Sequence, residues 1–176
     1  MDRLNGLLRH KRPLAFVTKG LDSMDGRLVS YAEKLPGLIA NANAFIGIGG
    51  PCIARELANR QPTASVYACR DPEAARWAAG LMQTPYYRLG VSADVYGVEA
   101  CAALKNFYAI GVSAMQTRHP DATRPDGYSK NPTAGAFNQA SREMAALAVL
   151  LGGQRETAFD LAGIGDLHVT VGGGRN

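Results

Sequence analysis

The sequence contains few cysteines, and none of them is arranged to bind a metal. Cys52, Cys69 and Cys101 lie far apart, with no C-x-x-C pair among them. An odd number of isolated cysteines is typical of reduced thiols and favours a cytoplasmic location. Residues 1–12 are polar and basic, with no apolar run long enough for a signal peptide, so none is expected.

Long uncharged apolar runs are also missing. The nearest candidate for a membrane span, Val95–Met115, is 21 residues long but contains Glu99 and Lys105. Each of these charges would cost about 2.5–3.5 kcal/mol near the centre of a bilayer. The stretch is therefore predicted to be a helix buried within protein, and no membrane insertion is expected.

A stripe of basic residues, which is typical of a nucleic-acid-binding surface, is absent as well. The chain has 19 Lys and Arg against 15 Asp and Glu, a formal charge of +4, and apart from Arg9, Lys11 and Arg12 its cations are scattered. A scattered positive excess favours a small phosphorylated substrate or a cofactor over a nucleic acid. For any single cation, a solvated surface position is the simpler explanation.

The glycine fingerprint of dinucleotide-binding proteins does not occur in this sequence. That fingerprint, G-x-G-x-x-G, follows a strand and opens a helix whose N-terminus holds the pyrophosphate. The nearest string runs from Gly47 to Cys52 and lacks the third glycine. Pyrophosphate binding of the Rossmann type is therefore not predicted from these residues.

Up to residue 91 the sequence alternates between short apolar runs and helical patterns. The predicted strands are 14–18, 44–48, 63–69 and 86–91. The predicted helices are 27–35, 52–59 and 71–83. Strands that alternate with helices indicate an α/β layer with a largely parallel sheet.

From residue 92 onward the pattern is helical. Residues 95–115 and 131–151 are rich in Ala, Leu and Met and are predicted to form helices. The polar segment 117–131 between them contains prolines and a glycine and is predicted to be a loop. The sequence thus predicts an α/β part over residues 1–91 and an all-helical part over residues 92–176.

Lys105 is the first candidate for chemistry. At helical spacing its neighbours are Cys101, Tyr108 and Val112, none of which carries a charge at neutral pH. Apolar surroundings disfavour the ammonium form and lower the pKa of a lysine, which suits general acid–base catalysis. The alternative is a lysine that extends to the surface or pairs with a carboxylate.

Asp166 is the second candidate, because Gly163 and Gly165 before it allow a tight turn and the close approach of another group. An aspartate in this position is also an ordinary helix N-cap. Further on, residues 172–176 place Arg175 beside a glycine run, a combination that can bind phosphate or form a basic terminus.

Two further candidates follow predicted strands. Lys19 comes after the first strand, and Gly49-Gly50-Pro51 comes after the second. Ligands of open α/β sheets bind at the carboxyl ends of strands, and helix N-termini attract anions. A glycine after a strand is more commonly only a turn.

Taken in order, the segments of the chain resemble the NAD(P)-dependent glycerol-3-phosphate dehydrogenase family. The strings that carry the resemblance are Thr18-Lys19-Gly20, Gly50-Pro51-x-x-Ala54-x-Glu56, Pro62-Thr63-Ala64, Leu81-Met82-Gln83-Thr84-Pro85, Gly97-Val98-Glu99, Ala103-Leu104-Lys105-Asn106, Gly163-x-Gly165-Asp166-Leu167 and Gly174-Arg175-Asn176. The resemblance implies a partial Rossmann-type α/β sheet followed by an all-α domain like the C-terminal helical domain of 6-phosphogluconate dehydrogenase. Residues 1–91 would be the last part of the NAD(P)-binding domain, and residues 92–176 the first part of the helical substrate domain.

The resemblance also implies a role for individual residues. Lys105 would exchange a proton with the C2 oxygen of the substrate, and Asp166 would bind substrate and help to set the charge of that lysine. The other implied substrate-binding residues are Lys19, Gly50, Cys52, Asn106, Thr170, Gly174, Arg175 and Asn176. The implied cofactor-binding residues, for NAD or NADP, are Lys19, Ala54 and Arg175.

The sequence departs from the family in three places. Cys52 stands where the family usually has Ser or Thr, which replaces a hydroxyl donor by a weaker thiol. The loop at residues 117–131 is longer and richer in proline. The chain also begins inside the family's first domain and stops just after Arg175-Asn176, so the opening strands and the last helices are expected to be absent.

The residues and the resemblance leave two functions open. The first is oxidoreduction between sn-glycerol 3-phosphate and dihydroxyacetone phosphate, part of glycerophospholipid metabolism, by a chain that forms a homodimer. The second is a non-catalytic helical interaction or phosphate-binding module, since a partial sheet leaves an unpaired edge that can associate with another chain. A related enzyme of the ketopantoate reductase type shares the lysine but not the set of strings.

Overall fold

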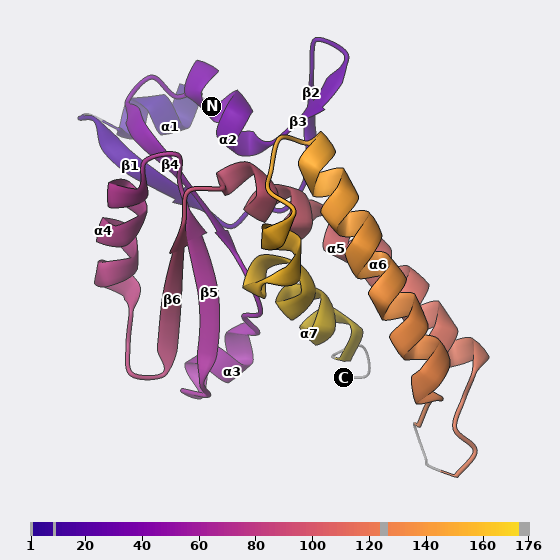
Figure 1. Cartoon of the computed structure of the whole chain (residues 1–176). Coiled ribbons are helices and arrows are strands. Elements are labelled where there is room, and N and C mark those ends of the chain that lie inside the picture. The colour runs from indigo at the N-terminus through magenta and orange to yellow at the C-terminus, as the bar shows by residue number, and fades with distance from the viewer. Residues whose placement is uncertain (1, 9, 124–126, 173–176) are drawn as a thin grey trace.

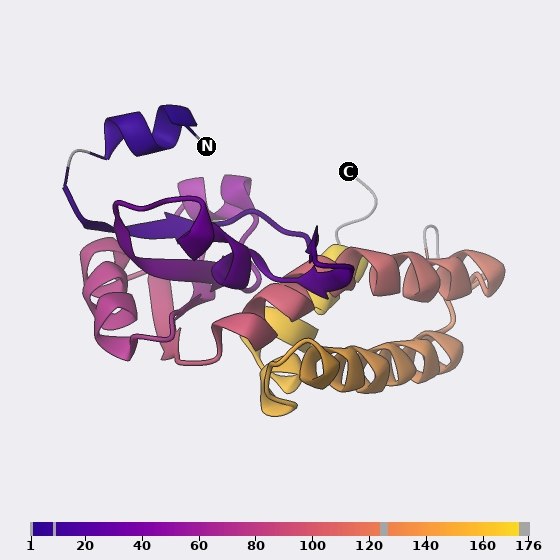
Figure 2. The ribbon, with the colours of Figure 1, turned by 90° about the horizontal axis from the view of Figure 1, so that it is seen from above.

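The computed structural model of the chain describes residues 2–8, 10–123 and 127–172. An α/β part lies at one end of the molecule, and a helical part extends away from it (Figures 1 and 2). Strand β6 (Tyr87–Ser92) is the last of the sheet, and helix α5 (Val95–Arg118) follows it.

The sheet contains β1 (Arg12–Phe16), β4 (Ala42–Gly49), β5 (Thr63–Ala68) and β6, in the order β1-β4-β5-β6. β1 pairs parallel to β4, and β5 pairs parallel to β6, as expected. The central pair, β4 and β5, is antiparallel, so the sheet is mixed and the largely parallel arrangement is wrong at that point. The cause lies in the connection: helix α3 (Ala54–Ala58) buries no residue and therefore does not cross over a face of the sheet.

Helix α4 (Pro72–Met82) covers one face of the sheet and confirms the helix predicted there. Its N-cap Asp71 accepts a hydrogen bond from the backbone N–H of Glu73, and Pro72 occupies the first turn, where its missing N–H costs nothing. The helix packs its buried alanines against strand residues in a small core of Ala44, Ile46, Tyr67, Cys69, Ala75, Ala78 and Ala79.

The helix predicted at residues 27–35 is largely wrong. The structure has a hairpin of β2 (Asp22–Met24) and β3 (Arg27–Val29), followed by the short helix α2 (Tyr31–Lys34) and the 3-10 turn η1 (Leu35–Gly37). The turn is Asp25-Gly26, and both residues have positive φ, 52° and 77°. Asp-Gly is a favoured pair for such two-residue hairpin turns, and this signal outweighs the helical spacing after it. A further short helix, α1 (Asp2–Leu7), precedes the sheet.

The helical part begins with α5 and α6 (Lys130–Leu150), which run antiparallel beside each other (Figure 1). A 3-10 turn η2 (Glu156–Phe159), a π turn η3 (Leu161–Gly165) and helix α7 (Asp166–Gly172) then return the chain to α5 near the sheet. The core between these helices is made mostly of small residues, with Met144, Leu167, Val112 and Tyr108 as its larger members.

Helix α5 confirms the helix predicted for Val95–Met115 and extends to Arg118, but only part of it is buried, because Phe107 and Ile110 are exposed. Among the described residues, no helix is long and apolar enough to cross a membrane. The three cysteines, all in the described part, are unpaired; Cys52 is exposed, whereas Cys69 and Cys101 are buried.

Candidate active site

Helix α5 carries Lys105 into the interface between α5, α7 and the sheet. The helix is capped by Asp94, whose side chain accepts a hydrogen bond from the backbone N–H of Gly97 at 3.0 Å. Lys105 is 7 % exposed, and Cys101, Tyr108 and Val112 on the same face are also buried. The predicted apolar face beside this lysine is therefore confirmed, and the alternative of pairing with a carboxylate is observed as well, because Lys105 contacts Asp166.

Asp166 is the first residue of α7 and is delivered by the π turn η3. A Cβ on Gly163 would lie only 2.0 Å from the carbonyl oxygen of Ala158, so the turn can close only with glycine at this position. The close approach predicted for these glycines is confirmed. Asp166 is 2 % exposed, which is unusual for a carboxylate unless it is paired.

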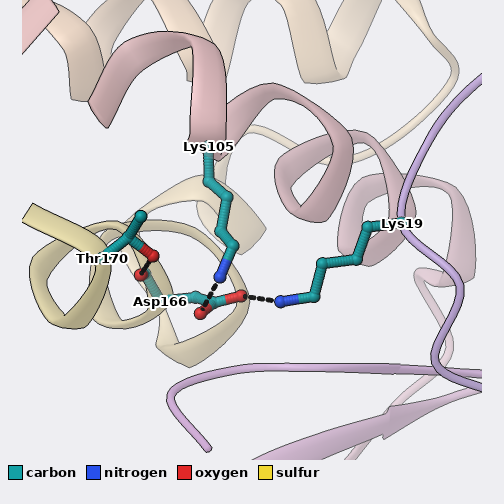
Figure 3. A network of polar contacts seen from close by, with 4 residues as sticks. All are labelled: Lys19, Lys105, Asp166 and Thr170. Atoms are coloured by element: carbon teal, nitrogen blue, oxygen red, sulfur yellow. Dashed lines mark hydrogen bonds and ion pairs between the residues drawn. The ribbon is translucent and has the colours of Figure 1, made fainter. Parts of the chain in front are cut away.

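Asp166 joins two lysines from distant parts of the chain (Figure 3). Its Oδ1 accepts a hydrogen bond from Lys105 Nζ, and its Oδ2 accepts one from Lys19 Nζ at 2.9 Å. Lys19 lies in the loop after β1, and its side chain is 35 % exposed, so it forms the open side of the cluster. Within α7, the hydroxyl of Thr170 donates to the backbone oxygen of Asp166 at 2.7 Å.

The surroundings of Lys105 shift its pKa below the ordinary value for a lysine. Burial lowers the pKa of Lys105, because the ammonium loses its hydration. The hydrogen bond to Asp166 opposes this shift, and the neighbouring Lys19 adds to it. Two cations share one carboxylate, so the cluster keeps a positive excess in a position to attract an anion.

The cluster forms one wall of an open cavity of about 910 Å³. Five of the residues singled out in the sequence line it: Lys19, Cys52, Lys105, Asp166 and Thr170. Ala54 and Asn106 are exposed and are not among the described residues that line this cavity. Gly174, Arg175 and Asn176 lie outside the described residues.

Gly50 is not among the residues that line the cavity; it lies against strand β5. It has a φ of +116°, and a Cβ there would lie 3.1 Å from the Cα of Ser65 and 3.4 Å from the carbonyl oxygen of Ala64. The chain leaving β4 therefore passes directly over β5. Cys52 and α3, which follow this passage in the chain, contribute residues to the cavity lining.

Three further polar or charged side chains, to which the sequence analysis assigned no role, line the cavity: Arg55, Glu56 and His168. Arg55 and Glu56 sit in α3, directly after the Gly-Gly-Pro bend, and this position is the signal that could have identified them. His168 follows Asp166 by two residues, and its ring meets Phe137 edge-to-face at 6.2 Å. The described residues contain no group of three or more His, Cys, Asp or Glu side chains that could hold a metal ion.

An α/β layer and a helical layer thus share one buried lysine–aspartate cluster beside an open cavity. The family models for the N-terminus and the C-terminus of NAD-dependent glycerol-3-phosphate dehydrogenase match residues 1–75 and 94–176. The chain belongs to the NAD-dependent glycerol-3-phosphate dehydrogenase family.

Curated relatives agree with this assignment. An NADP(+)-dependent glycerol-3-phosphate dehydrogenase from Archaeoglobus fulgidus is 34% identical over 164 residues, which are 93% of this chain and 48% of the relative. A glycerol-3-phosphate dehydrogenase [NAD(P)+] from Bifidobacterium longum is 37% identical over 156 residues, 89% of this chain and 43% of the relative. The chain thus spans less than half the length of these two relatives.

Solved structures show the same fold. The crystal structure of glycerol-3-phosphate dehydrogenase from Coxiella burnetii has a TM-score of 0.79 and 28% sequence identity, with 96% of this chain and 48% of that chain covered. The enzyme from Dunaliella salina has a TM-score of 0.81 over 98% of this chain and 28% of that one, and at 24% identity it supports the fold alone. The expected partial Rossmann-type sheet followed by a helical domain is confirmed.

Proposed function

We propose that this chain carries the substrate and proton-transfer site of an NAD(P)-dependent glycerol-3-phosphate dehydrogenase, which interconverts sn-glycerol 3-phosphate and dihydroxyacetone phosphate. The observation that carries the proposal is the contact of Lys105 and Lys19 with the two oxygens of Asp166 at the wall of an open cavity. Family membership supports the same reaction.

In the oxidation direction, neutral Lys105 accepts the hydroxyl proton of C2 while the C2–H bond breaks. NAD(P)⁺, when bound, supplies the acceptor for the hydride that leaves C2. Asp166 then stabilises the ammonium formed on Lys105, because its Oδ1 already accepts a hydrogen bond from Nζ. In the reduction direction, the same ammonium donates its proton to the C2 oxygen.

The substrate phosphate needs cations and hydrogen-bond donors. Lys19 is the accessible cation of the cluster, and Thr170 and Cys52 offer further polar groups in the cavity. We assign the other substrate contacts to Gly50, Asn106, Gly174, Arg175 and Asn176, on the strength of the family resemblance. The cofactor contacts are assigned to Lys19, Ala54 and Arg175 on the same ground.

The cavity fits the reacting end of the cofactor better than its pyrophosphate. Lys105 and Lys19 stand at a cavity of about 910 Å³, which is large enough for a triose phosphate and a nicotinamide ring together. No G-x-G-x-x-G turn occurs in the sequence, so this chain offers no glycine-rich cradle for the pyrophosphate. Affinity for NAD(P)H is accordingly expected to be weak.

We further propose a domain boundary near residue 92, a cytoplasmic location and a homodimer. The unpaired cysteines support the location. The dimer is suggested by β1, which is one of the two edge strands of the sheet and leaves one row of backbone groups unpaired within it. Sedimentation of the purified chain would test the dimer, and a monomer at micromolar concentration would contradict it.

The proposed function is tested by titrating the purified chain with NADH and NADPH and by following their oxidation with dihydroxyacetone phosphate. Nicotinamide binding with a Kd below about 100 μM, together with substrate-dependent oxidation, supports the enzyme. No binding at about 1 mM and no turnover would favour the non-catalytic phosphate-binding module instead. Turnover of a branched keto acid in place of the triose phosphate would favour the ketopantoate-reductase type.

A further inference from the structure

Glu99 is a buried carboxylate that the proposed reaction does not use. It lies on α5, and only 5 % of it is exposed. Its Oε2 accepts a hydrogen bond from the backbone N–H of Ala32 at 2.8 Å. Burial raises the pKa of Glu99, and hydrogen bonds from the Ala32 backbone, the Ser30 side chain and the Tyr31 backbone oppose that shift. Burying this carboxylate costs desolvation free energy, which its hydrogen bond to the first turn of α2 offsets in part.

The segment held by Glu99 is the first turn of α2. This helix has only four residues, too few to be stable by itself, and its N-cap Ser30 accepts only a long bond of 3.3 Å from Glu33. The first N–H groups of a helix have no partner within it, and Glu99 satisfies one of them. Strand β4 of the sheet packs against the Glu99 side chain, because a Cβ on Gly47 would lie 3.4 Å from the Cγ of Glu99.

Helix α2 in turn lies against the loop that carries Lys19. A Cβ on Gly20 would be 3.8 Å from the hydroxyl oxygen of Tyr31, so the Tyr31 ring borders the residue next to Lys19. An ion pair of 2.5 Å between Lys34 and Asp22 ties the same helix to the strand after the loop. A continuous path therefore leads from Glu99 through α2 to the loop, and from there to the contact of Lys19 with Asp166.

We propose that Glu99 is a positioning residue that keeps Lys19 on Asp166, acting through α2 and the Tyr31 ring. The inference rests on the proposed function in one respect, namely that Lys19 is a cation that binds the substrate. The path itself is a property of the folded chain. Glu99 and Lys105 share α5, so the helix that supplies the proton-transferring lysine also orients the second cation of the cluster.

If Glu99 loses its acceptor oxygens, this path predicts a change in the pKa of Lys105. Lys19 lowers the pKa of Lys105, and Asp166 raises it. If Lys19 leaves Asp166, the carboxylate serves Lys105 alone, and the pKa of Lys105 rises. Competitive labelling of amines with acetic anhydride over a pH series, read by mass spectrometry, measures that pKa in the full chain without substrate. The exposed Lys11 serves as the internal reference.

In Glu99→Met we expect the labelling pKa of Lys105 to rise by at least about 0.5 units, toward the value in Lys19→Met. Glu99→Gln keeps an acceptor for the Ala32 N–H and should stay within about 0.2 units of wild type. Ile46→Ala, which opens a cavity in the separate core beside α4, should lower stability without moving the Lys105 profile. A wild-type profile in Glu99→Met, or an equal shift in Ile46→Ala, would overturn the proposal.

A second variant covers the case in which Glu99→Met does not fold. Tyr31→Ala removes the ring that borders Gly20 at a half-buried position, and the same rise in the Lys105 profile is expected. An unchanged profile in folded Tyr31→Ala overturns the path. Since the labelling needs no turnover, a chain without dehydrogenase activity would contradict the proposed function and leave this result intact.

Discussion

The π turn that delivers Asp166 should not tolerate a side chain at Gly163. In Gly163→Ala the new Cβ would lie 2.0 Å from the oxygen and 2.5 Å from the carbon of the Ala158 carbonyl. Optimal contacts between non-bonded carbons are about 3.5–4.0 Å, so the turn must move by about 1 Å or more. Ala158 is fully buried and Ala162 is 1 % exposed, which leaves little room for that movement. Overpacking of this kind costs about 1–3 kcal/mol, and the absence of free space places this site near the upper value, roughly 3 kcal/mol.

Equilibrium unfolding in urea, followed by circular dichroism, measures this loss. Gly111→Ala is the matched control, because Gly111 is an exposed helical residue of α5 with nothing within 4 Å of a Cβ. There the same chemical change should raise the free energy of unfolding by about 0.5–1 kcal/mol. If Gly163→Ala is as stable as wild type, or gains as much as Gly111→Ala, the close approach described for the π turn is wrong.

Three further outcomes are expected. Asp94→Ala removes three hydrogen bonds that the carboxylate accepts, one at the start of α5 and two from the segment after α6. The free energy of unfolding in urea should fall by about 3 kcal/mol. A fall of less than about 1 kcal/mol would contradict this expectation. Cys52 should react with a thiol reagent in the native protein, whereas Cys101, which is buried with its pKa raised to about 12, should react only after unfolding, and equal rates would refute the burial. The rate of glycerol 3-phosphate oxidation should rise with pH as Lys105 becomes neutral, with an inflection below the ordinary lysine value of 10.5, and Asp166→Asn should move the inflection to lower pH because Asp166 raises the pKa of Lys105. An inflection that stays in place would remove Asp166 from that role.

The local pattern of the sequence was sufficient for much of the fold. The apolar runs at 44–48 and 63–69 and the long Ala-rich segments coincide with β4, β5, α5 and α6. At Asp25-Gly26 the helical spacing that follows favours a helix, but the turn residues decide the local structure and form a hairpin. The antiparallel pairing of β4 and β5 depends on how a loop returns to the sheet, which strand propensity does not encode.

For the candidate site too, local patterns in the sequence predict some features, whereas contacts between distant residues depend on the fold. The apolar face around Lys105 and the glycines before Asp166 were visible as local patterns. The partners themselves are separated by 61 residues for Lys105 and Asp166 and by 147 for Lys19 and Asp166. Tertiary packing alone brings them together, so no local pattern predicts the cluster, and only the family resemblance indicates it. The sequence pattern assigns no role to Arg55 and Glu56, because exposed charges in a short helix resemble ordinary solvated residues.

The central claim is that Lys105 transfers the proton at C2. The most direct measurement compares wild type and Lys105→Met in the oxidation of NAD(P)H that depends on dihydroxyacetone phosphate, with circular dichroism as the check that both are folded. The account predicts turnover by wild type and a loss of about 10²–10⁴-fold in Lys105→Met, the usual contribution of a positioned acid or base. Turnover by folded Lys105→Met within about threefold of wild type, or none by wild type itself, would contradict it.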